Sequence, residues 1–195
     1  MTDASSSPRT AVLVGPYGSG KSTLFEALLA AAGSPVRRGA ERVGSELCLA
    51  HCTFLNEPWA LIDCPGSVEF AYAAEAAIAA ADLAVVVCEP DPGRSPTVAP
   101  LLRLLDQYGL PFLVFVNRVD MLAGRARDTV AALQPFTSRP LVLRQVPIRE
   151  SGAVIGYVDV VNERAYRYRR GTVSDRVAVP GEMVEREREA RAGLV

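Results

Sequence analysis

The chain has 195 residues, enough for one domain with a small additional subdomain and a sizeable buried core. Hydrophobic residues make up 49% and charged residues 22%, a composition that excludes disordered and fibrous proteins. The net charge of −1 argues against a protein held on nucleic acid by its overall charge, while leaving room for a local basic patch.

After a serine-rich tail at residues 1–9, the chain alternates short apolar strands with helices. Strands are predicted at residues 10–14, 47–55, 59–62, 83–88 and 112–116. Helices are predicted at residues 22–32, 68–80, 98–108 and 122–133. This alternation is typical of an α/β fold with a mostly parallel sheet flanked by helices.

The pattern changes after residue 136. Strands are predicted at residues 141–148, 154–161 and 165–170 without helices between them, followed by a charged helix at residues 182–192. The alternating charges of residues 185–189 indicate a solvated face with ion pairs. The predicted organisation is a tail (1–9), an α/β core (10–136), a small β-rich insertion subdomain (137–180) and a charged helix (181–195).

Cysteine use and hydropathy both favour the cytoplasm. The four cysteines are Cys48, Cys52, Cys64 and Cys88, and the N-terminal residues have no apolar signal sequence. No apolar run reaches the ~18 residues that a membrane span requires. We therefore predict free, buried thiols in a reducing compartment and no membrane partner.

Residues 15–22 (GPYGSGKS) match G-x-x-x-x-G-K-[ST] between a predicted strand and a predicted helix. Glycines let the main chain of such a loop wrap around phosphate oxygens with its N–H groups. Lys21 would reach the β and γ phosphates, and Ser22 would place its hydroxyl on Mg²⁺. Lys21 is the only lysine among 21 basic residues, as expected where one compact ammonium has a particular task. The predicted binding residues here are Gly15, Pro16, Tyr17, Gly18, Ser19, Gly20, Lys21, Ser22 and Thr23.

A second motif follows the strand predicted at residues 59–62. An aspartate at the end of such a strand can hold Mg²⁺ through water, and Gly66 can offer its N–H to a γ-phosphate. The predicted binding residues are Asp63, Cys64, Pro65, Gly66 and Ser67.

A third motif, residues 117–120 (NRVD), follows the strand predicted at residues 112–116. Asp120 can accept hydrogen bonds from N1–H and the N2 amine of guanine, a donor pair that adenine lacks. Asn117 is expected to tie neighbouring loops together. The predicted binding residues are Asn117, Arg118, Val119 and Asp120.

Residues 15–24 (GPYGSGKSTL), 63–70 (DCPGSVEF) and 117–120 together resemble a translational GTPase, above all elongation factor G and its bacterial paralogues. Residues 139–168 are similar to the insertion that elongation factor G carries between its fourth and fifth GTPase motifs. The resemblance implies a P-loop NTPase fold, GTP/GDP and Mg²⁺ as ligands, the ribosome as partner, and hydrolysis assisted by Lys21 and Gly66. Nothing in the pattern predicts a DNA partner or an oligomeric state.

The sequence departs from that family at three places. Ser67 stands where the family has the histidine that positions the attacking water, which weakens the case for fast hydrolysis. Ser45 is the best candidate for the Mg²⁺-binding hydroxyl of a first switch that looks short. The fifth GTPase motif is not visible, so we expect the chain to be a truncated part of a longer protein.

Two other groupings have alternative interpretations. The spacing of Cys48, His51 and Cys52, with Cys64 nearby, matches no common zinc site. We therefore interpret them as ordinary strand residues without a metal. The segment 164–170 interleaves Tyr166 and Tyr168 with arginines at 164, 167, 169 and 170. It is either an RNA contact or a strand with one packed aromatic face and one solvated basic face.

Three functional hypotheses remain open from the sequence. The first is a GTP/GDP-binding domain with slow GTPase activity on the ribosome, and the second is a non-hydrolysing, nucleotide-dependent binding module, motivated by Ser67. The third is an ATP-using P-loop kinase, which requires Asp120 to be incidental.

Overall fold

The computed structural model describes residues 8–34, 47–67, 71–122, 124–169 and 171–192. Contacts divide the chain into two compact units, which we call the first unit (residues up to 89 and 94–117) and the second unit (residues 90–93 and from 118 onward). The start of the predicted tail and of the predicted helix at 68–80 lies outside the described residues. Each unit is described separately below.

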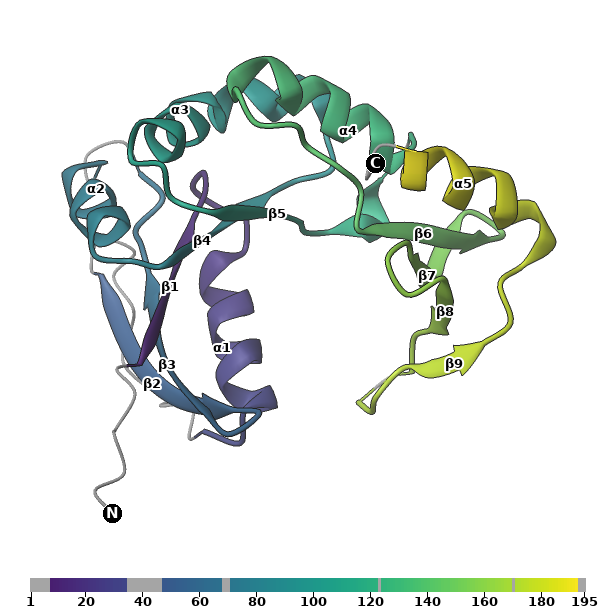
Figure 1. Ribbon diagram of the computed structural model, residues 1–195, viewed down its shortest axis with the longest axis horizontal. Helices are drawn as coiled ribbons and strands as arrows, with labels where there is room; N and C mark the ends of the chain where they lie inside the picture. Colours follow the sequence, from purple (N-terminus) through teal and green to yellow (C-terminus); the bar gives the residue numbers. More distant parts are fainter. Residues whose placement is uncertain (1–7, 35–46, 68–70, 123, 170, 193–195) are drawn as a thin grey trace. The chain divides into compact units, whose positions relative to one another are not determined.

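The first unit contains a five-stranded sheet in the order β2-β3-β1-β4-β5 (Figure 1). Its strands are β1 (Arg9–Val14), β2 (Cys48–Phe54), β3 (Glu57–Asp63), β4 (Leu83–Cys88) and β5 (Phe112–Val116). Strand β1 pairs in parallel with β3 and β4, β4 pairs in parallel with β5, and β2 is antiparallel to β3. The prediction of a mostly parallel α/β sheet is confirmed.

The described residues of the first unit form three α-helices: α1 (Lys21–Ala31), α2 (Ala71–Ala79) and α3 (Ala99–Gln107). Phe25 and Leu29 of α1 are buried against Leu13, Leu61 and Val87 on one face of the sheet. Alternate strand residues point to the opposite face, where α2 and α3 lie (Figure 1). The central strands are thus covered on both faces, as parallel strands require.

The second unit contains an antiparallel sheet in the order β6-β7-β8-β9. Its strands are β6 (Gln145–Glu150), β7 (Ala153–Asp159), β8 (Arg164–Arg167) and β9 (Asp175–Val177). Its α-helices are α4 (Ala126–Leu133) and α5 (Val184–Ala192). Val158 and Ala165, both fully buried, pack with Met183 in the core of this unit. The predicted β-rich part is confirmed as a sheet.

Short 3₁₀ helices occupy several connections. They are η2 (Pro92–Thr97), η3 (Val119–Met121), η4 (Gln134–Phe136) and η5 (Gly181–Met183).

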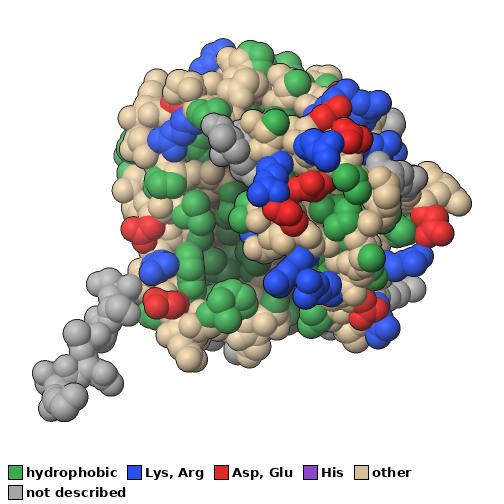
Figure 2. All heavy atoms as spheres, turned by 45° about the vertical axis from the view of Figure 1, so that its right-hand side comes forward, with side chains coloured by type: hydrophobic (Ala, Val, Ile, Leu, Met, Phe, Trp, Pro, Cys, Tyr) green, Lys and Arg blue, Asp and Glu red, His purple; other side chains and the backbone are tan. Residues whose placement is uncertain are grey.

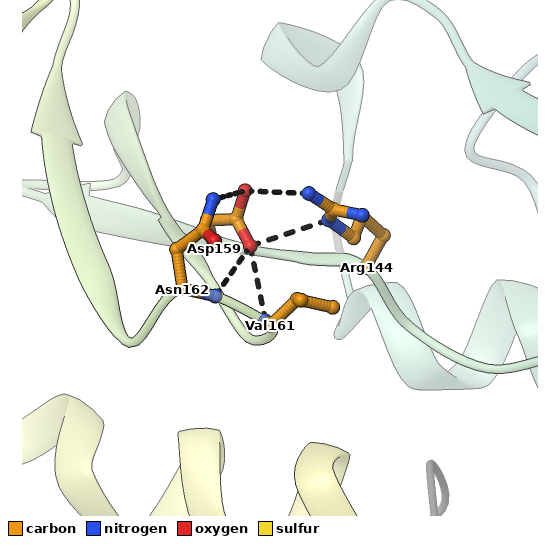
Figure 3. A network of polar contacts seen from close by, with 4 residues as sticks. All are labelled: Arg144, Asp159, Val161 and Asn162. Atoms are coloured by element: carbon orange, nitrogen blue, oxygen red, sulfur yellow. Dashed lines mark hydrogen bonds and ion pairs between the residues drawn. The ribbon is translucent and has the colours of Figure 1, made fainter.

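The turn between β7 and β8 is held by one carboxylate. Asp159 accepts hydrogen bonds from the main-chain N–H of Val161 at 3.0 Å and of Asn162 at 3.1 Å (Figure 3). It also accepts from Nε and Nη2 of Arg144 at 3.2 and 3.1 Å. Burial alone would raise the pKa of this carboxyl, but the Arg144 and turn hydrogen bonds outweigh it and lower the pKa.

Several predicted boundaries were wrong, each for a local reason. The helix predicted at 122–133 begins only at Ala126, where Asp128 accepts a hydrogen bond from Arg125 N–H at 3.0 Å. The strand predicted at 141–148 begins at Gln145, because the Leu141 N–H donates instead to Gln134 Oε1 at 2.8 Å. Strand β9 was not predicted, since its three residues carry no alternation long enough to detect.

No helix within the described ranges is both long and apolar enough to cross a bilayer.

Candidate functional site

The first unit brings the first two predicted motifs, and Asn117 from the third, to one edge of its sheet. The loop starting at Gly15 follows β1, the loop after Asp63 follows β3, and Asn117 follows β5. Because these three strands run in the same direction, their carboxyl ends share that edge, which is where open α/β sheets bind ligands.

The loop between β1 and α1 depends on glycines at close approaches. A β-carbon on Gly15 would lie 2.2 Å from the main-chain oxygen of Val87. Gly20 has a φ of 93°, and a β-carbon there would lie 2.2 Å from Nδ2 of Asn117. No other residue type fits either position without displacing its neighbour, so the loop is shaped to let main chain approach a ligand closely.

Lys21 is buried at the start of α1, with 6% of its surface exposed. Its Nζ donates a hydrogen bond to the main-chain oxygen of Pro16 at 2.9 Å, so the side chain folds back over the loop. Burial lowers the pKa of this ammonium, while the nearby Asp63 carboxylate opposes the shift. A partly desolvated cation in this position is ready to exchange its carbonyl partner for a phosphate oxygen.

The segment after β3 packs directly on the glycine-rich loop. Cys64 extends the parallel pairing through a hydrogen bond from its N–H to the oxygen of Leu13 at 3.1 Å. A β-carbon on Gly66 would lie 2.4 Å from Nζ of Lys21 and 2.8 Å from the nitrogen of Tyr17. The Gly66 main chain therefore lies against the ammonium, which only glycine permits.

Asn117 connects the end of β5 to the same loop. Its Nδ2 donates a hydrogen bond to the main-chain oxygen of Ser19 at 2.8 Å, across 98 residues of sequence. Its own N–H donates to the oxygen of Cys88 at 2.8 Å. The tie between loops that was predicted for Asn117 is present.

Two thiols near this edge are electrostatically unsuited to act as nucleophiles. Burial raises the pKa of Cys64 to about 12 and that of Cys88 to about 11. Both cysteines therefore remain neutral thiols that fill space beside the loop.

The residues present fit a nucleotide phosphate chain and a magnesium ion. Ser19 is 2% exposed, and its Oγ is buried without a hydrogen-bond partner among the described residues. Gly15, Gly20 and Gly66 leave the space that β-carbons would fill. Ser22 is exposed at the first turn of α1, and Asp63 supplies a buried carboxylate near Lys21. Hydroxyl and carboxylate oxygens are suitable Mg²⁺ ligands, directly or through water.

The remaining predicted residues fall into different places. Pro16, Pro65 and Ser67 are half-buried in the two loops, whereas Tyr17, Gly18 and Thr23 are exposed. Arg118, Val119 and Asp120 belong to the second unit, where Val119 and Asp120 lie in η3. Ser45 lies outside the described residues. The guanine contact of Asp120 and the metal contact of Ser45 stay predictions.

Sequence reasoning missed the main-chain supports of the site. The main-chain oxygen of Val87 packs against Gly15. The oxygen of Cys88 accepts a hydrogen bond from the Asn117 N–H, and the oxygen of Pro16 accepts one from Lys21. Every residue type carries the same carbonyl, so no sequence signal could have singled them out.

The alternation of side chains along β2 places the cysteines and the histidine of the possible zinc grouping on opposite faces. Cys48 and Cys52 are half-buried and pack against the core of the first unit. His51, between them on β2, is exposed on the other face. These three side chains do not converge.

The model of the elongation factor Tu GTP-binding domain matches residues 47–165. The chain belongs to this family. A curated relative, an elongation factor G-like protein of Synechocystis sp., is 37% identical over 96% of this chain and 30% of its own length. Elongation factor G 1 of Geobacter sulfurreducens is 29% identical over 72% of this chain and 21% of its own length.

A crystal structure of a Thermus thermophilus protein has a similar fold, with a TM-score of 0.83 and 29% identity over 95% of this chain and 30% of that protein. The resemblance to elongation factor G-like GTPases is confirmed, and the chain is a GTP-binding domain of that type. It spans about a third or less of the length of these relatives.

Proposed function

We propose that this chain binds GTP and GDP with Mg²⁺ and forms the nucleotide-dependent switch of an elongation factor G-like translation factor. The observation that carries this proposal is the convergence of the Gly15–Gly20 cradle, Lys21, Gly66 and Asn117 at one sheet edge. Family membership makes guanine the expected base.

Each residue has a distinct expected task. Main-chain N–H groups of residues 18–21 hold phosphate oxygens, and Lys21 neutralises the β and γ phosphates. Ser22, with Asp63 behind a water and Ser45 from the first switch, would hold Mg²⁺. When bound, this ion would supply positive charge that offsets the negative charge developing on the phosphates.

Guanine selection is assigned to Asp120. Its carboxylate would accept hydrogen bonds from N1–H and the N2 amine, while Arg118 and Val119 shape the loop and Asn117 ties it to the phosphate loop. Adenine would leave the carboxylate unpaired in the bound state, which costs affinity. Guanine selection is also the feature that separates a GTPase from an ATP-using kinase.

Hydrolysis would be attack of water on the γ-phosphorus, with cleavage of the bond to the β-phosphate oxygen to give GDP and phosphate. The N–H of Gly66 would donate to the γ-phosphate, and Lys21 would stabilise the transferred charge. Ser67 has no imidazole with which to position the water, so we expect slow turnover that depends on the ribosome. A switch that binds without hydrolysing is the second candidate, favoured by that same residue.

The ribosome as partner and the cytoplasm as location are suggested by the family and are part of this proposal. The chain covers about a third of the Synechocystis relative, so we assign it only nucleotide binding and not the work of a complete factor. Its place in elongation, recycling or regulation would depend on further domains.

Competition binding tests the proposal. The purified chain is titrated with fluorescent GDP and GTP in Mg²⁺ and competed with ATP, next to Lys21→Ala. We expect guanine nucleotides to win by at least about 100-fold and Lys21→Ala to weaken binding by about 100-fold. Asp120→Asn should lose guanine selectivity and gain xanthine nucleotides, because an amide can donate to the xanthine O2. Equal affinity for ATP and GTP would overturn the proposal.

Single-turnover hydrolysis separates the two candidates. GTP is mixed with wild-type chain and with Ser67→His, each with and without ribosomes. Stimulated hydrolysis by wild type excludes the non-hydrolysing switch. Hydrolysis by Ser67→His alone, with unchanged GTP affinity, establishes it.

A further inference from the structure

The antiparallel sheet of the second unit has two different faces. On one face, Val146, Ile148, Val158 and Ala165 are buried and pack with Met183. The residues between them along each strand point to the other face, because side chains alternate along a strand. That second face is where tyrosines and arginines collect.

A continuous row crosses this second face through all four strands. Register places Pro147 of β6 opposite Tyr157 of β7, Tyr157 opposite Tyr166 of β8, and Tyr166 opposite Arg176 of β9. Tyr168, two residues after Tyr166, continues the ladder through its N–H, which donates to Ile155 oxygen at 2.8 Å. We call the surface made by Tyr157, Tyr166, Tyr168, Arg164 and Arg176 the tyrosine face.

The three rings form one aromatic platform. Tyr157 and Tyr166 stack with centroids 5.2 Å apart and planes at 24°, and Tyr157 lies 5.8 Å from Tyr168. Tyr168 is 48% exposed, so the edge of the platform is open. Burial raises the pKa of Tyr157 and Tyr168 above the ordinary value of a phenol, and both side chains are neutral near pH 7. The Tyr157 and Tyr168 planes are tilted by 42°, which leaves the partly open Tyr168 ring as the place where another planar ring could stack.

Charge on the tyrosine face is positive once internal pairs are considered. Asp159 lies opposite Arg164 in the register, but its carboxylate is occupied by Arg144 and the turn (Figure 3). Among the described residues, Arg164 and Arg176 have no ion pair and are both exposed.

Other arginines of this sheet are already neutralised. Arg167 pairs with Glu150 at 2.8 Å, and Arg169 pairs with Asp175. Figure 2 likewise shows basic and acidic side chains lying next to one another on the right-hand part of the visible surface. Arg164 and Arg176 are therefore two available cations next to Tyr166, one along β8 and one opposite it on β9.

We propose that the tyrosine face binds single-stranded RNA, with a base stacked on Tyr168 and the platform behind it, and with Arg164 and Arg176 on flanking phosphates. Aromatic side chains on a sheet surface stack unpaired bases, and guanidinium groups contact the backbone. The choice of RNA over DNA rests on the proposed function in translation, whereas the chemistry of stacking and charge is carried by this face alone. Recognition would be tolerant of base sequence.

Fluorescence anisotropy with labelled RNA tests this proposal. The probes are oligouridine and oligoadenosine of about 12 nucleotides. The full chain is titrated at about 0.05 M and 0.15 M salt. The variants are Tyr168→Ala, Tyr168→Phe and the double variant Arg164→Ala/Arg176→Ala. Tyr72→Ala and Arg103→Ala serve as matched controls, because both side chains are exposed on the first unit.

We expect Tyr168→Ala to raise the Kd about tenfold and Tyr168→Phe to preserve it, since stacking requires the ring and not the hydroxyl. The double arginine variant should lower the slope of log K against log salt by about 1.4, at about 0.7 for each phosphate contact on a single strand. The two controls should bind as wild type does.

Several outcomes would overturn the proposal. These are no binding at low salt by a folded chain, an equal loss in the controls, or an equal loss in Tyr168→Phe. Equal affinity for the matching DNA oligonucleotide would overturn the assignment to RNA. If Tyr168→Ala weakened ribosome association without changing RNA binding, a protein partner would replace RNA. GDP titration of the same variants keeps this test separate, because nucleotide binding in the first unit should not change.

Discussion

The two units of this chain build their polar features in different ways. In the first unit, the candidate site is made mainly from main chain: glycines at close approaches, and carbonyls of Pro16, Ser19 and Cys88 that accept hydrogen bonds. In the second unit, side chains do this work, through Asp159 at a turn and exposed Arg–Glu and Arg–Asp pairs. Substitutions should therefore be far more costly in the phosphate loop than on the small sheet.

The aromatic residues offer a way to follow the two units in solution. The only tryptophan, Trp59, lies on β3 of the first unit, so its fluorescence reports that unit. The six tyrosines are divided equally: 17, 72 and 108 lie in the first unit, whereas 157, 166 and 168 lie on or next to the sheet of the second. A change in the near-ultraviolet tyrosine signal without a change in tryptophan fluorescence therefore reports the second unit.

The largest effect is expected for Gly15→Ala. The added methyl group would lie 2.2 Å from the oxygen of Val87, which is main chain inside a central strand and cannot move away cheaply. We expect a loss of about 3 kcal/mol in the free energy of unfolding of the first unit, together with loss of GDP binding. Urea unfolding followed by Trp59 fluorescence measures the first, and titration with fluorescent GDP the second.

Gly33→Ala is the control for this prediction. Gly33 has a φ of 68° but no atom within 4 Å of an added β-carbon, so only backbone strain is introduced. The expected loss is about 1 kcal/mol with unchanged GDP affinity. If Gly15→Ala and Gly33→Ala lost the same unfolding free energy, the close contact at Gly15 would contribute nothing beyond backbone strain.

A smaller effect is expected for Asp159→Asn. The amide keeps the shape of the side chain but removes the charge that accepts from Arg144, Val161 and Asn162. We expect the second unit to lose about 2 kcal/mol of unfolding free energy, with little change in the first. A shift of the tyrosine transition while the Trp59 transition stays in place would show both results. Asp175→Asn, which alters an exposed ion pair, should change stability by about 0.5 kcal/mol or less.

The same carboxylate should give the second unit an acid dependence. The folded-state pKa of Asp159 is lowered, so its stabilising contribution is complete above the unfolded value of about 3.9 and is lost as pH falls through the folded pKa. We expect wild type to lose more unfolding free energy than Asp159→Asn does as pH falls from about 5 to about 2. Parallel pH profiles for the two proteins would contradict this.

The smallest effect is expected on α5. Arg188 and Glu185 form an i,i+3 pair at 2.8 Å, with 71% and 75% of their side chains exposed. Because exposed pairs are screened by water, Arg188→Ala should change unfolding free energy by about 0.3 kcal/mol. Thermal unfolding at low and high salt measures it. A loss comparable to that of Asp159→Asn would mean that the surface pairs of the second unit contribute as much stability as its buried Asp159 carboxylate.

Much of the first unit could be predicted because its strands are short, apolar and bounded by strong signals. Residues 83–88 and 112–116 were predicted with the bounds that β4 and β5 have. The hairpin between β2 and β3 turns at Leu55 and Asn56, which have φ of 52° and 63°. The sequence predicts this turn at residues 56–58, whereas the structure turns at residues 55–56, because pairing on both sides fixes the conformation of Leu55.

The second unit was harder, because its boundaries depend on single long-range hydrogen bonds. Gln134 captures the main chain at Leu141 and Arg139, which delays β6 until Gln145. The secondary-structure propensity of a residue does not indicate which distant residue it will hydrogen-bond, so these contacts could not be predicted. The candidate site shows the same division: its motif residues could be read from the sequence, and the carbonyls that support them could not.

The sequence by itself determined the kind of protein this is. The order of its three motifs, the solitary Lys21 and the alternation of strands with helices specified the phosphate loop and its place in an α/β fold. Only the tertiary structure decided that Gly66 lies against Lys21, that Asn117 reaches Ser19, and that three tyrosines share one sheet face. Motifs persist as local patterns of residue type, whereas these contacts depend on strand register, which joins residues far apart in the chain.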